Sequence, residues 1–206
     1  MATDFVHVFQ PGDGPWTLLL LHGTGGDEND LVPLGRQLAP KANLLSPKGK
    51  VLENGVSARF FRRLAVGQLD IPDLIERTDE LAGFVTEAAD RYSFDPGRIV
   101  ALGLSNGANI GVSLLFRHPE LLAGAALLRP MLPYEPPDDL ALDRRPVLVA
   151  AGGKDHYVPA AESTNLGKSI EAHGGELTMH LNPEAGHGLT EGDLVETSRW
   201  LTELTV

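Results

Sequence analysis

The sequence has no cysteine, a deficit of positive charge and no long hydrophobic run. Without cysteine there is no disulfide bond, no thiolate metal site and no cysteine nucleophile, and the chain suits a reducing compartment. The 17 lysines and arginines are outnumbered by 28 aspartates and glutamates, and the net charge of −11 repels the phosphates of nucleic acids and anionic lipid surfaces. We therefore expect no nucleic acid and no membrane among the partners of this protein.

Segments that direct a chain into or across a membrane are also lacking. Residues 1–7 carry neither the basic start nor the apolar centre of a secretory signal, and no stretch approaches the roughly 20 apolar residues of a membrane span. We therefore expect a cytoplasmic protein. Its 206 residues, 42% of them hydrophobic, suffice for a single domain with a sizeable core over residues 1–206.

Short apolar runs alternate with helical patterns along the chain. The runs expected to form strands are 16–21, 42–45, 99–102, 124–128, 147–151 and 177–181. The patterns expected to form helices are 30–38, 72–92, 106–117, 160–173 and 190–204. This alternation predicts an α/β fold with a mostly parallel, doubly wound sheet and helices on both faces. The loop 130–146 between two of the strands is too short for a helical cap domain.

The run Gly103-Leu104-Ser105-Asn106-Gly107 has the spacing G-x-S-x-G and lies between a predicted strand and a predicted helix. In such a nucleophile elbow the serine has a strained backbone conformation, and the glycines relieve collisions with the neighbouring chain. A sequence of this composition contains the spacing by chance about 0.1 times, so other residues must support the interpretation. A serine hydroxyl also needs a base, an acid that orients the base and an oxyanion site.

Asp155 and His187 each follow the carboxyl end of a predicted strand, as Ser105 does. Functional groups of open α/β sheets collect at that edge, and the chain order Ser105, Asp155, His187 is the order of α/β-hydrolase triads. We expect His187 to take the proton of Ser105 and Asp155 to fix the histidine tautomer. Taken alone, Asp155 would be interpreted as a turn residue, and His156 is a weaker candidate for the base. The joint pattern favours the triad.

Glycines also follow the strand predicted at 16–21, in the run His22-Gly23-Thr24-Gly25-Gly26. This run resembles an H-G-G-G oxyanion loop, in which glycines free the backbone to aim N–H groups at a developing negative charge. The expected donors are the N–H of Thr24 and the N–H of Asn106, which lies at the positive end of a predicted helix. Because these donors stabilise the charge, we expect neither a metal nor another cofactor.

Other loops supply candidates for substrate binding. Phe60 and Phe61 lie in a long segment between a strand and a helix, and we expect them to form a small apolar patch together with Met131 and Leu132. Packing within a loop is the alternative for Met131 and Leu132. Arg129 either binds a substrate carboxylate or pairs with a nearby acid, and we favour the ion pair.

The sequence resembles the phospholipase/carboxylesterase family of α/β-hydrolases, which includes the acyl-protein thioesterases, and it looks most like the short bacterial carboxylesterases. The motifs that carry the resemblance extend over nearly the whole chain and are Leu21-His22-Gly23-Thr24-Gly25-Gly26, Arg59-Phe60-Phe61, Gly103-Leu104-Ser105-Asn106-Gly107, Asp155-His156-Tyr157-Val158-Pro159 and Gly186-His187-Gly188. The resemblance implies an α/β-hydrolase fold, the triad and oxyanion donors named above, and a homodimer as a common state. Thioesterase-type relatives usually carry glutamine where this chain has Asn106. Dienelactone hydrolases share the fold but use cysteine where this chain has Ser105.

These observations predict a serine carboxylesterase that hydrolyses short-chain carboxylic esters, as small-molecule substrates, through an acyl-Ser105 intermediate. An acyl thioesterase or lysophospholipase is the alternative, because the same chemistry serves both. Nucleotide binding by residues 23–26 is disfavoured, because Glu28 stands where G-x-G-x-x-G requires its third glycine. An inactive hydrolase fold kept as a binding module is disfavoured because the triad residues are all present.

Overall fold

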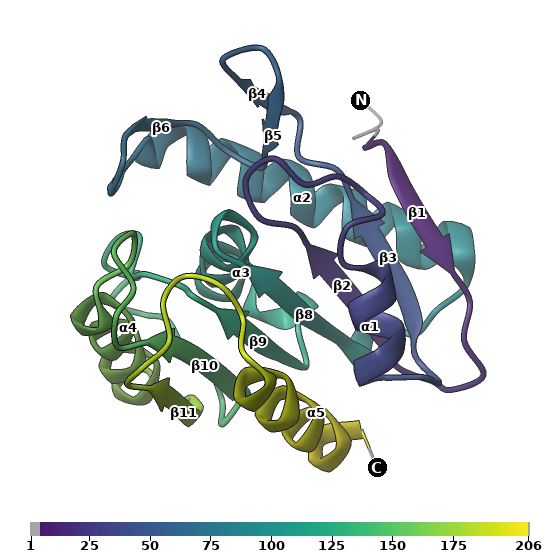
Figure 1. Cartoon of the computed structure of the whole chain (residues 1–206). Coiled ribbons are helices and arrows are strands. Elements are labelled where there is room, and N and C mark those ends of the chain that lie inside the picture. Colours follow the sequence, from purple (N-terminus) through teal and green to yellow (C-terminus); the bar gives the residue numbers. More distant parts are fainter. Residues whose placement is uncertain (1–4, 206) are drawn as a thin grey trace.

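A sheet of seven strands forms the centre of the computed structural model, which describes residues 5–205 (Figure 1). In sheet order the strands are β1 (His7–Gln10), β3 (Asn43–Pro47), β2 (Thr17–Leu21), β8 (Ile99–Leu104), β9 (Gly124–Leu128), β10 (Pro146–Gly152) and β11 (Glu176–Asn182). Neighbouring strands run parallel, except that β1 pairs antiparallel with β3 at one edge. The mostly parallel sheet predicted from the sequence is confirmed.

Helices cover both faces of the sheet. One face is covered by α1 (Val32–Leu38) and α5 (Glu191–Thr205), and the other by α2 (Ile71–Tyr92), α3 (Asn106–Arg117) and α4 (Ala160–Ala172) (Figure 1). Each face has its own cluster of buried apolar side chains, to which the helices of that face contribute. The doubly wound architecture is the one expected from the alternation of apolar runs and helical patterns.

Strand β2 shows why the central strands are apolar without interruption. Leu18 and Leu20 belong to the cluster beneath α1 and α5, whereas Leu19 and Leu21 belong to the cluster beneath α2, α3 and α4. All four side chains are fully buried. Because successive side chains of a strand point to opposite faces, a strand covered by helices on both faces needs apolar residues at every position.

The segment between β3 and α2 forms two hairpins that project from the sheet (Figure 1). The first pairs β4 (Val51–Glu53) with β5 (Ser57–Arg59), and the second pairs β6 (Arg63–Ala65) with β7 (Gln68–Leu69). The first hairpin turns at Asn54-Gly55, where both residues have positive φ, 51° and 75°. These two residues are the centre of a β-turn in which the N–H of Val56 donates to the carbonyl of Glu53 at 3.2 Å, and Asn-Gly is the pair that positive φ at both positions favours. The sequence analysis had treated this segment only as a long connection, because strands of two or three residues are too short to show alternation.

The long loop 129–145 between β9 and β10 contains neither a helix nor a strand. The structure therefore has no cap domain at that position, as predicted. No helix within residues 5–205 combines the length and the apolar character needed to cross a lipid bilayer. Residues 1–4, on which the expectation of no secretory signal partly rests, lie outside the described residues.

Candidate active site

Ser105 occupies a sharp turn between β8 and α3. Its backbone has φ 53° and ψ −110°, which is strained for a residue other than glycine, and its N–H donates to the carbonyl of Leu128 at 2.8 Å. A Cβ atom on Gly107 would overlap the carbonyl oxygen of Leu21, and one on Gly103 would lie 2.6 Å from the carbonyl oxygen of Gly107. The two glycines are therefore required by the close approach of backbone to backbone at this turn.

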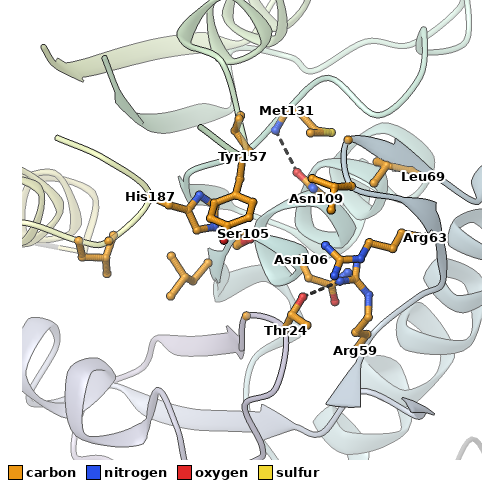
Figure 2. Close-up of a pocket in the computed structure, with 17 residues that line it drawn as sticks. Thr24, Arg59, Arg63, Leu69, Ser105, Asn106, Asn109, Met131, Tyr157 and His187 are labelled. Carbon is orange, nitrogen blue, oxygen red and sulfur yellow. Dashed lines mark hydrogen bonds between the residues drawn. The ribbon is translucent and has the colours of Figure 1, made fainter. Parts of the chain in front are cut away.

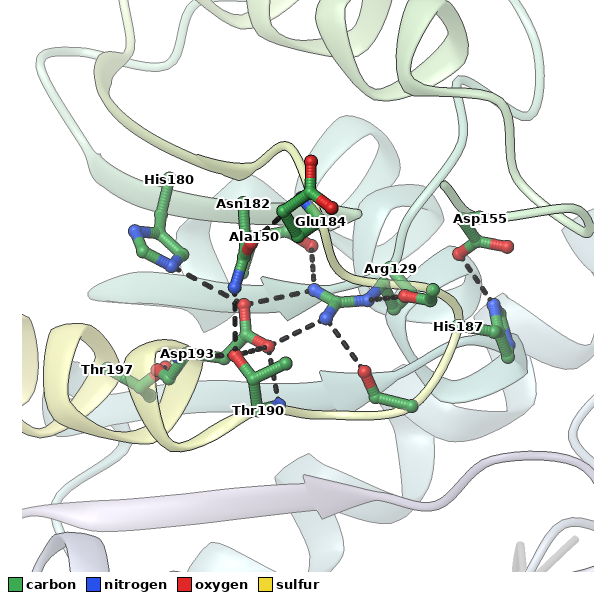
Figure 3. Close-up of polar contacts among 12 residues, drawn as sticks. Arg129, Ala150, Asp155, His180, Asn182, Glu184, His187, Thr190, Asp193 and Thr197 are labelled. Carbon is green, nitrogen blue, oxygen red and sulfur yellow. Dashed lines mark hydrogen bonds and ion pairs between the residues drawn. The ribbon is translucent and has the colours of Figure 1, made fainter. Parts of the chain in front are cut away.

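The side chains of Ser105, His187 and Asp155 form one hydrogen-bonded series. The Ser105 hydroxyl donates to Nε2 of His187 at 2.9 Å, and Nδ1 of His187 donates to Oδ2 of Asp155 at 2.8 Å (Figure 3 shows the second bond). Ser105 follows β8, Asp155 follows β10 and His187 follows β11, so the carboxyl edge of the sheet brings them together. Since an ionised carboxylate only accepts hydrogen bonds, the proton of the neutral imidazole lies on Nδ1 and Nε2 is free to act as a base.

Asp155 is held as a carboxylate by its neighbours. Burial acts to raise the pKa of this carboxyl, but the N–H groups of Val158 and Tyr157 and the ring of His187 more than offset that effect and lower the pKa below its ordinary value. The two N–H groups donate to Oδ1 at 3.0 and 2.8 Å, while His187 takes Oδ2. Asp155 is therefore ionised at neutral pH and can stabilise an imidazolium that forms at His187.

The loop after β2 is fixed by the neutral ring of His22. Nε2 of His22 accepts from the N–H of Gly49 at 2.9 Å, so Nδ1 carries the proton and donates to the carbonyl of Gly23 at 2.6 Å. Burial lowers the pKa of His22, which favours this neutral form. These contacts stabilise the loop, and His22 does not line the cavity beside Ser105.

Thr24 and Asn106, the two residues expected to supply oxyanion donors, lie beside the same cavity as Ser105. Both residues line that cavity, and no hydrogen-bond acceptor within residues 5–205 is paired with either N–H. Asn106 is the first residue of α3, where a backbone N–H has no acceptor inside the helix. Arg59 supports the other donor, since its Nη1 donates to Oγ1 of Thr24 at 2.6 Å. The arrangement suits the binding of an oxyanion beside Ser105.

The side chain of Asn106 has a structural contact that the sequence did not predict. Its Oδ1 accepts from the N–H of Phe60 at 2.8 Å, so the residue after the serine anchors the segment that carries the two hairpins. Phe60 and Phe61 themselves lie in the hydrophobic core, only 2% and 0% exposed, and they do not line the cavity. Their expected place in a substrate patch is corrected here. Full burial of two adjacent aromatic rings removes more apolar surface from water than a place in a solvent-facing wall, and therefore stabilises the fold more.

A cavity of about 480 Å³ opens beside Ser105 (Figure 2). Its apolar wall contains Leu69 and Met131, and its polar wall contains Arg59 and Arg63. No aspartate or glutamate of the described residues lines it. Sequence reasoning identified only Met131 among these four, because the others come from the hairpin segment, whose fold was not predicted.

A second cavity of about 520 Å³ adjoins the first and shares Met131 and Tyr157 with it. The ring of Tyr157 packs edge-on against the ring of His187, with 5.1 Å between the ring centroids. Leu132 lines only this second cavity, and so does His156, which makes no hydrogen bond with Ser105. The structure therefore places Met131 at the reacting serine and Leu132 one cavity away.

Arg129 does not reach either cavity. It is fully buried and forms an ion pair with Asp193, with 2.6 Å between Nη2 and Oδ2. The interpretation as an ion pair is therefore correct, and contact with a substrate carboxylate is excluded by burial. Within residues 5–205 there is no group of three or more histidines, aspartates or glutamates arranged to hold a metal ion.

Known proteins share this fold and much of this sequence. Residues 65–195 match the model of the dienelactone hydrolase family. A Bacillus subtilis (strain 168) protein named as a hydrolase, MhqD, is 42% identical over 97% of this chain and 99% of its own length. The carboxylesterase of Bacillus cereus is 46% identical, with a TM-score of 0.93 over 97% of this chain and 94% of that one. A carboxylesterase from Mesorhizobium loti is 33% identical, with a TM-score of 0.85 over 93% and 90% of the two chains.

Gly107→Ala tests whether the turn at Ser105 depends on backbone contact. The added Cβ must displace the Leu21 carbonyl, so we expect a loss of about 3 kcal/mol in the free energy of unfolding together with a large loss of ester hydrolysis. Urea unfolding and a chromogenic ester measure the two effects. The matched control is Gly192→Ala in α5, whose Cβ would have no atom nearer than 3.7 Å and should leave both quantities unchanged or slightly improved. Normal stability in the Gly107 variant would contradict the packing argument.

Asp155→Asn tests the low pKa of the buried carboxyl. Because the folded state lowers this pKa, ionised Asp155 stabilises the fold above its unfolded-state pKa, and the stabilisation is lost as the pH falls through the folded-state pKa. We expect the variant to be less stable at pH 7 by about 1.5–3 kcal/mol, the usual worth of hydrogen bonds to an ionised group. Urea unfolding between pH 7 and pH 3 should show this difference shrinking below about pH 4. A difference that is constant over this range would rule out the stabilising carboxylate.

Proposed function

The chain belongs to the dienelactone hydrolase family and is a carboxylic ester hydrolase, and we propose that it hydrolyses short-chain esters through an acyl-Ser105 intermediate. The carboxylesterase relatives also confirm the predicted resemblance to the phospholipase/carboxylesterase family. The cysteine nucleophile expected of dienelactone hydrolases differs from Ser105. The family match includes Ser105, Asp155 and His187, so serine at position 105 is a difference within the family and not a reason to exclude it.

The observation that carries the proposal is the series of two hydrogen bonds, 2.9 Å from Ser105 to His187 and 2.8 Å from His187 to Asp155. In this arrangement Oγ of Ser105 attacks the ester carbonyl carbon while Nε2 of His187 removes the hydroxyl proton. The carbonyl oxygen becomes an oxyanion that accepts from the N–H groups of Thr24 and Asn106. Loss of one such donor typically costs about 3 kcal/mol of transition-state stabilisation.

The intermediate then collapses to an acyl-enzyme. The bond between the carbonyl carbon and the alcohol oxygen breaks, and Nε2 of His187 returns its proton to the departing alcohol. Water attacks the acyl group in the second half, with His187 again the base, and the acid leaves as Ser105 recovers its proton. Asp155 remains ionised throughout and stabilises the imidazolium.

The lining of the site supports short acyl groups, because its apolar wall faces two arginines. A cavity of about 480 Å³ lies beside Ser105, with Leu69 and Met131 as its apolar wall and two arginines on the other side. A long acyl chain would have to continue into the adjoining cavity past Tyr157. That continuation is what the alternative function, an acyl thioesterase or lysophospholipase, requires.

Single and double substitutions test the triad. Ser105→Ala and His187→Ala should each lower kcat by a factor of about 10⁶, and the double variant should be little worse, because the two residues act as a unit. Steady-state hydrolysis of an aryl ester measures kcat. A fluorophosphonate should label the wild type and leave Ser105→Ala unlabelled. Additive losses, or labelling of Ser105→Ala, would contradict the acyl-Ser105 route.

A series of esters of graded acyl length tests the substrate class. Each buried CH₂ should raise kcat/KM by an amount equivalent to about 0.8 kcal/mol until the chain extends beyond the apolar wall of Leu69 and Met131, so we expect the best rates between acetate and hexanoate esters. Thioesters of the same acyl lengths provide the matched comparison. A steady rise through palmitoyl substrates, or a preference for thioesters at equal length, would instead support the thioesterase or lysophospholipase function.

A further inference from the structure

The guanidinium of Arg129 is surrounded by hydrogen-bond acceptors, although it lines neither of the two cavities described above. It follows β9, its side chain is fully buried, and its guanidinium donates to backbone carbonyls and to Asp193 (Figure 3). Nε donates to the carbonyl of Gly186 at 3.0 Å and Nη2 to the carbonyl of Gly188 at 2.9 Å. Nη1 lies 3.3 Å from the carbonyl of Ala150. The guanidinium thus joins the end of β10 to the loop that follows β11.

The two carbonyls bound by Nε and Nη2 belong to the residues on either side of His187. The loop that carries His187 has no helix or strand between β11 and α5, so its shape depends on contacts of this kind. The planar guanidinium presents its donors in a fixed fork, and binding both carbonyls at once restricts the backbone before and after the histidine. A single point of attachment would leave the loop free to pivot.

Asp193 fixes the guanidinium from the other side. Its carboxylate lies 3.1 and 2.6 Å from Nη1 and Nη2 of Arg129, and it accepts from the N–H and the hydroxyl of Thr190 at 2.7 and 2.8 Å. Nε2 of His180 approaches the same carboxylate at 3.5 Å. The Thr190 contacts also cap the start of α5, because the Thr190 hydroxyl accepts from the N–H of Asp193 at 3.3 Å. The ion pair therefore attaches the His187 loop to the start of α5, which is itself held in place by the Thr190 contacts.

The backbone of Arg129 is adapted to this role. Its φ of 58° is a left-handed conformation that disfavours residues with a Cβ atom, and its N–H donates to the carbonyl of Ala150 at 2.7 Å. Strained backbone of this kind persists where the surrounding structure requires a particular side-chain direction. Here the required direction is toward the His187 loop.

We propose that Arg129 is a positioning residue, which holds His187 between Ser105 and Asp155 by clamping the carbonyls of Gly186 and Gly188. The inference rests on the proposed function, since His187 must be the base for its position to affect the rate. If the ion pair served stability alone, replacing both residues by neutral groups would leave kcat unchanged, because a buried pair can often be replaced in this way without loss of stability. The proposed clamp predicts instead that kcat falls in such a variant. The clamp needs donors that only the arginine supplies.

The test compares Arg129→Lys with a double variant that combines Arg129→Met and Asp193→Asn. The single variant Arg129→Met is not used to judge the proposal. Arg129→Met leaves a buried carboxylate without its counter-ion, so its loss of stability would obscure the result. The double variant removes the charge while the amide can still accept from Thr190, and it restores stability. We expect kcat about 100-fold below wild type in the double variant with KM changed less than threefold, since misplacing a catalytic group by about 1 Å has that effect.

Arg129→Lys separates charge from shape. Lysine keeps the positive charge beside Asp193, but a single ammonium cannot present the guanidinium fork to both carbonyls. We expect kcat to stay at least about tenfold below wild type, at a melting temperature near that of wild type. Full recovery of kcat in Arg129→Lys would show that the ion pair alone matters, and it would overturn the proposal.

A proton NMR measurement reports on the position of His187 independently of the stability of the fold. The proton shared by Nδ1 of His187 and Asp155 should give a downfield resonance in the wild type that is weakened or lost in the double variant. The control is Arg199→Met, which breaks the ion pairs of this exposed arginine with Glu196 and Glu203 in α5 and should keep wild-type kcat and resonance. Wild-type kcat and resonance in the double variant would overturn the proposal. Absence of hydrolysis by the wild type would instead contradict the proposed function, so the two failures are distinct.

Discussion

The close approach of α3 to the end of β2 is the constraint on which the site depends. Gly107 brings the helix backbone against the carbonyl of Leu21, and the turn before it holds Ser105 at positive φ above the sheet. The same approach places the start of α3 beside the loop that follows β2. Thr24 and Asn106, whose N–H groups are the proposed oxyanion donors, come from separate parts of the chain. They line one cavity because the backbone contact at Gly107 leaves no room for a Cβ atom.

Much of the fold and the triad could be predicted because local patterns determine them. Uninterrupted apolar runs such as β2 are typical of strands buried on both faces. The spacing G-x-S-x-G is typical of a sharp turn in which a Cβ atom on either glycine would collide with the neighbouring backbone. The place of Phe60 and Phe61 could not be predicted in this way. Their position depends on two short hairpins and on an amide, that of Asn106, which is 46 residues away from Phe60 along the chain. Sequence pattern alone does not distinguish an aromatic residue of the hydrophobic core from one that lines a substrate cavity.

Arg129 illustrates a different limit of sequence reasoning. An arginine after a strand at the carboxyl edge suits either an anionic substrate or an ion pair, and the choice depends on a partner 64 residues later in the chain. The structure decides it through burial, because a guanidinium with 0% exposure has no access to a substrate. The same burial requires that every donor have a partner, and the carbonyls around His187 are among the partners available.

The hairpin segment contacts both the wall of the cavity and the loop proposed to bind the oxyanion. It contributes Leu69 and Arg63 to the wall of the cavity. Within the same segment the N–H of Gly49 donates to His22, and the carbonyl of Ala58 accepts from the N–H of Gly25 at 2.8 Å.

These contacts hold the proposed oxyanion loop from outside the sheet, and Arg59 adds a hydrogen bond to Thr24. A substitution in the hairpin segment that enlarges the cavity therefore also disturbs the contacts that position Thr24. The proposed donor at Thr24 must be placed within about 0.5 Å to stabilise an oxyanion. The wall and the donor cannot be altered independently, and this coupling limits how far such a site can change its substrate without losing rate.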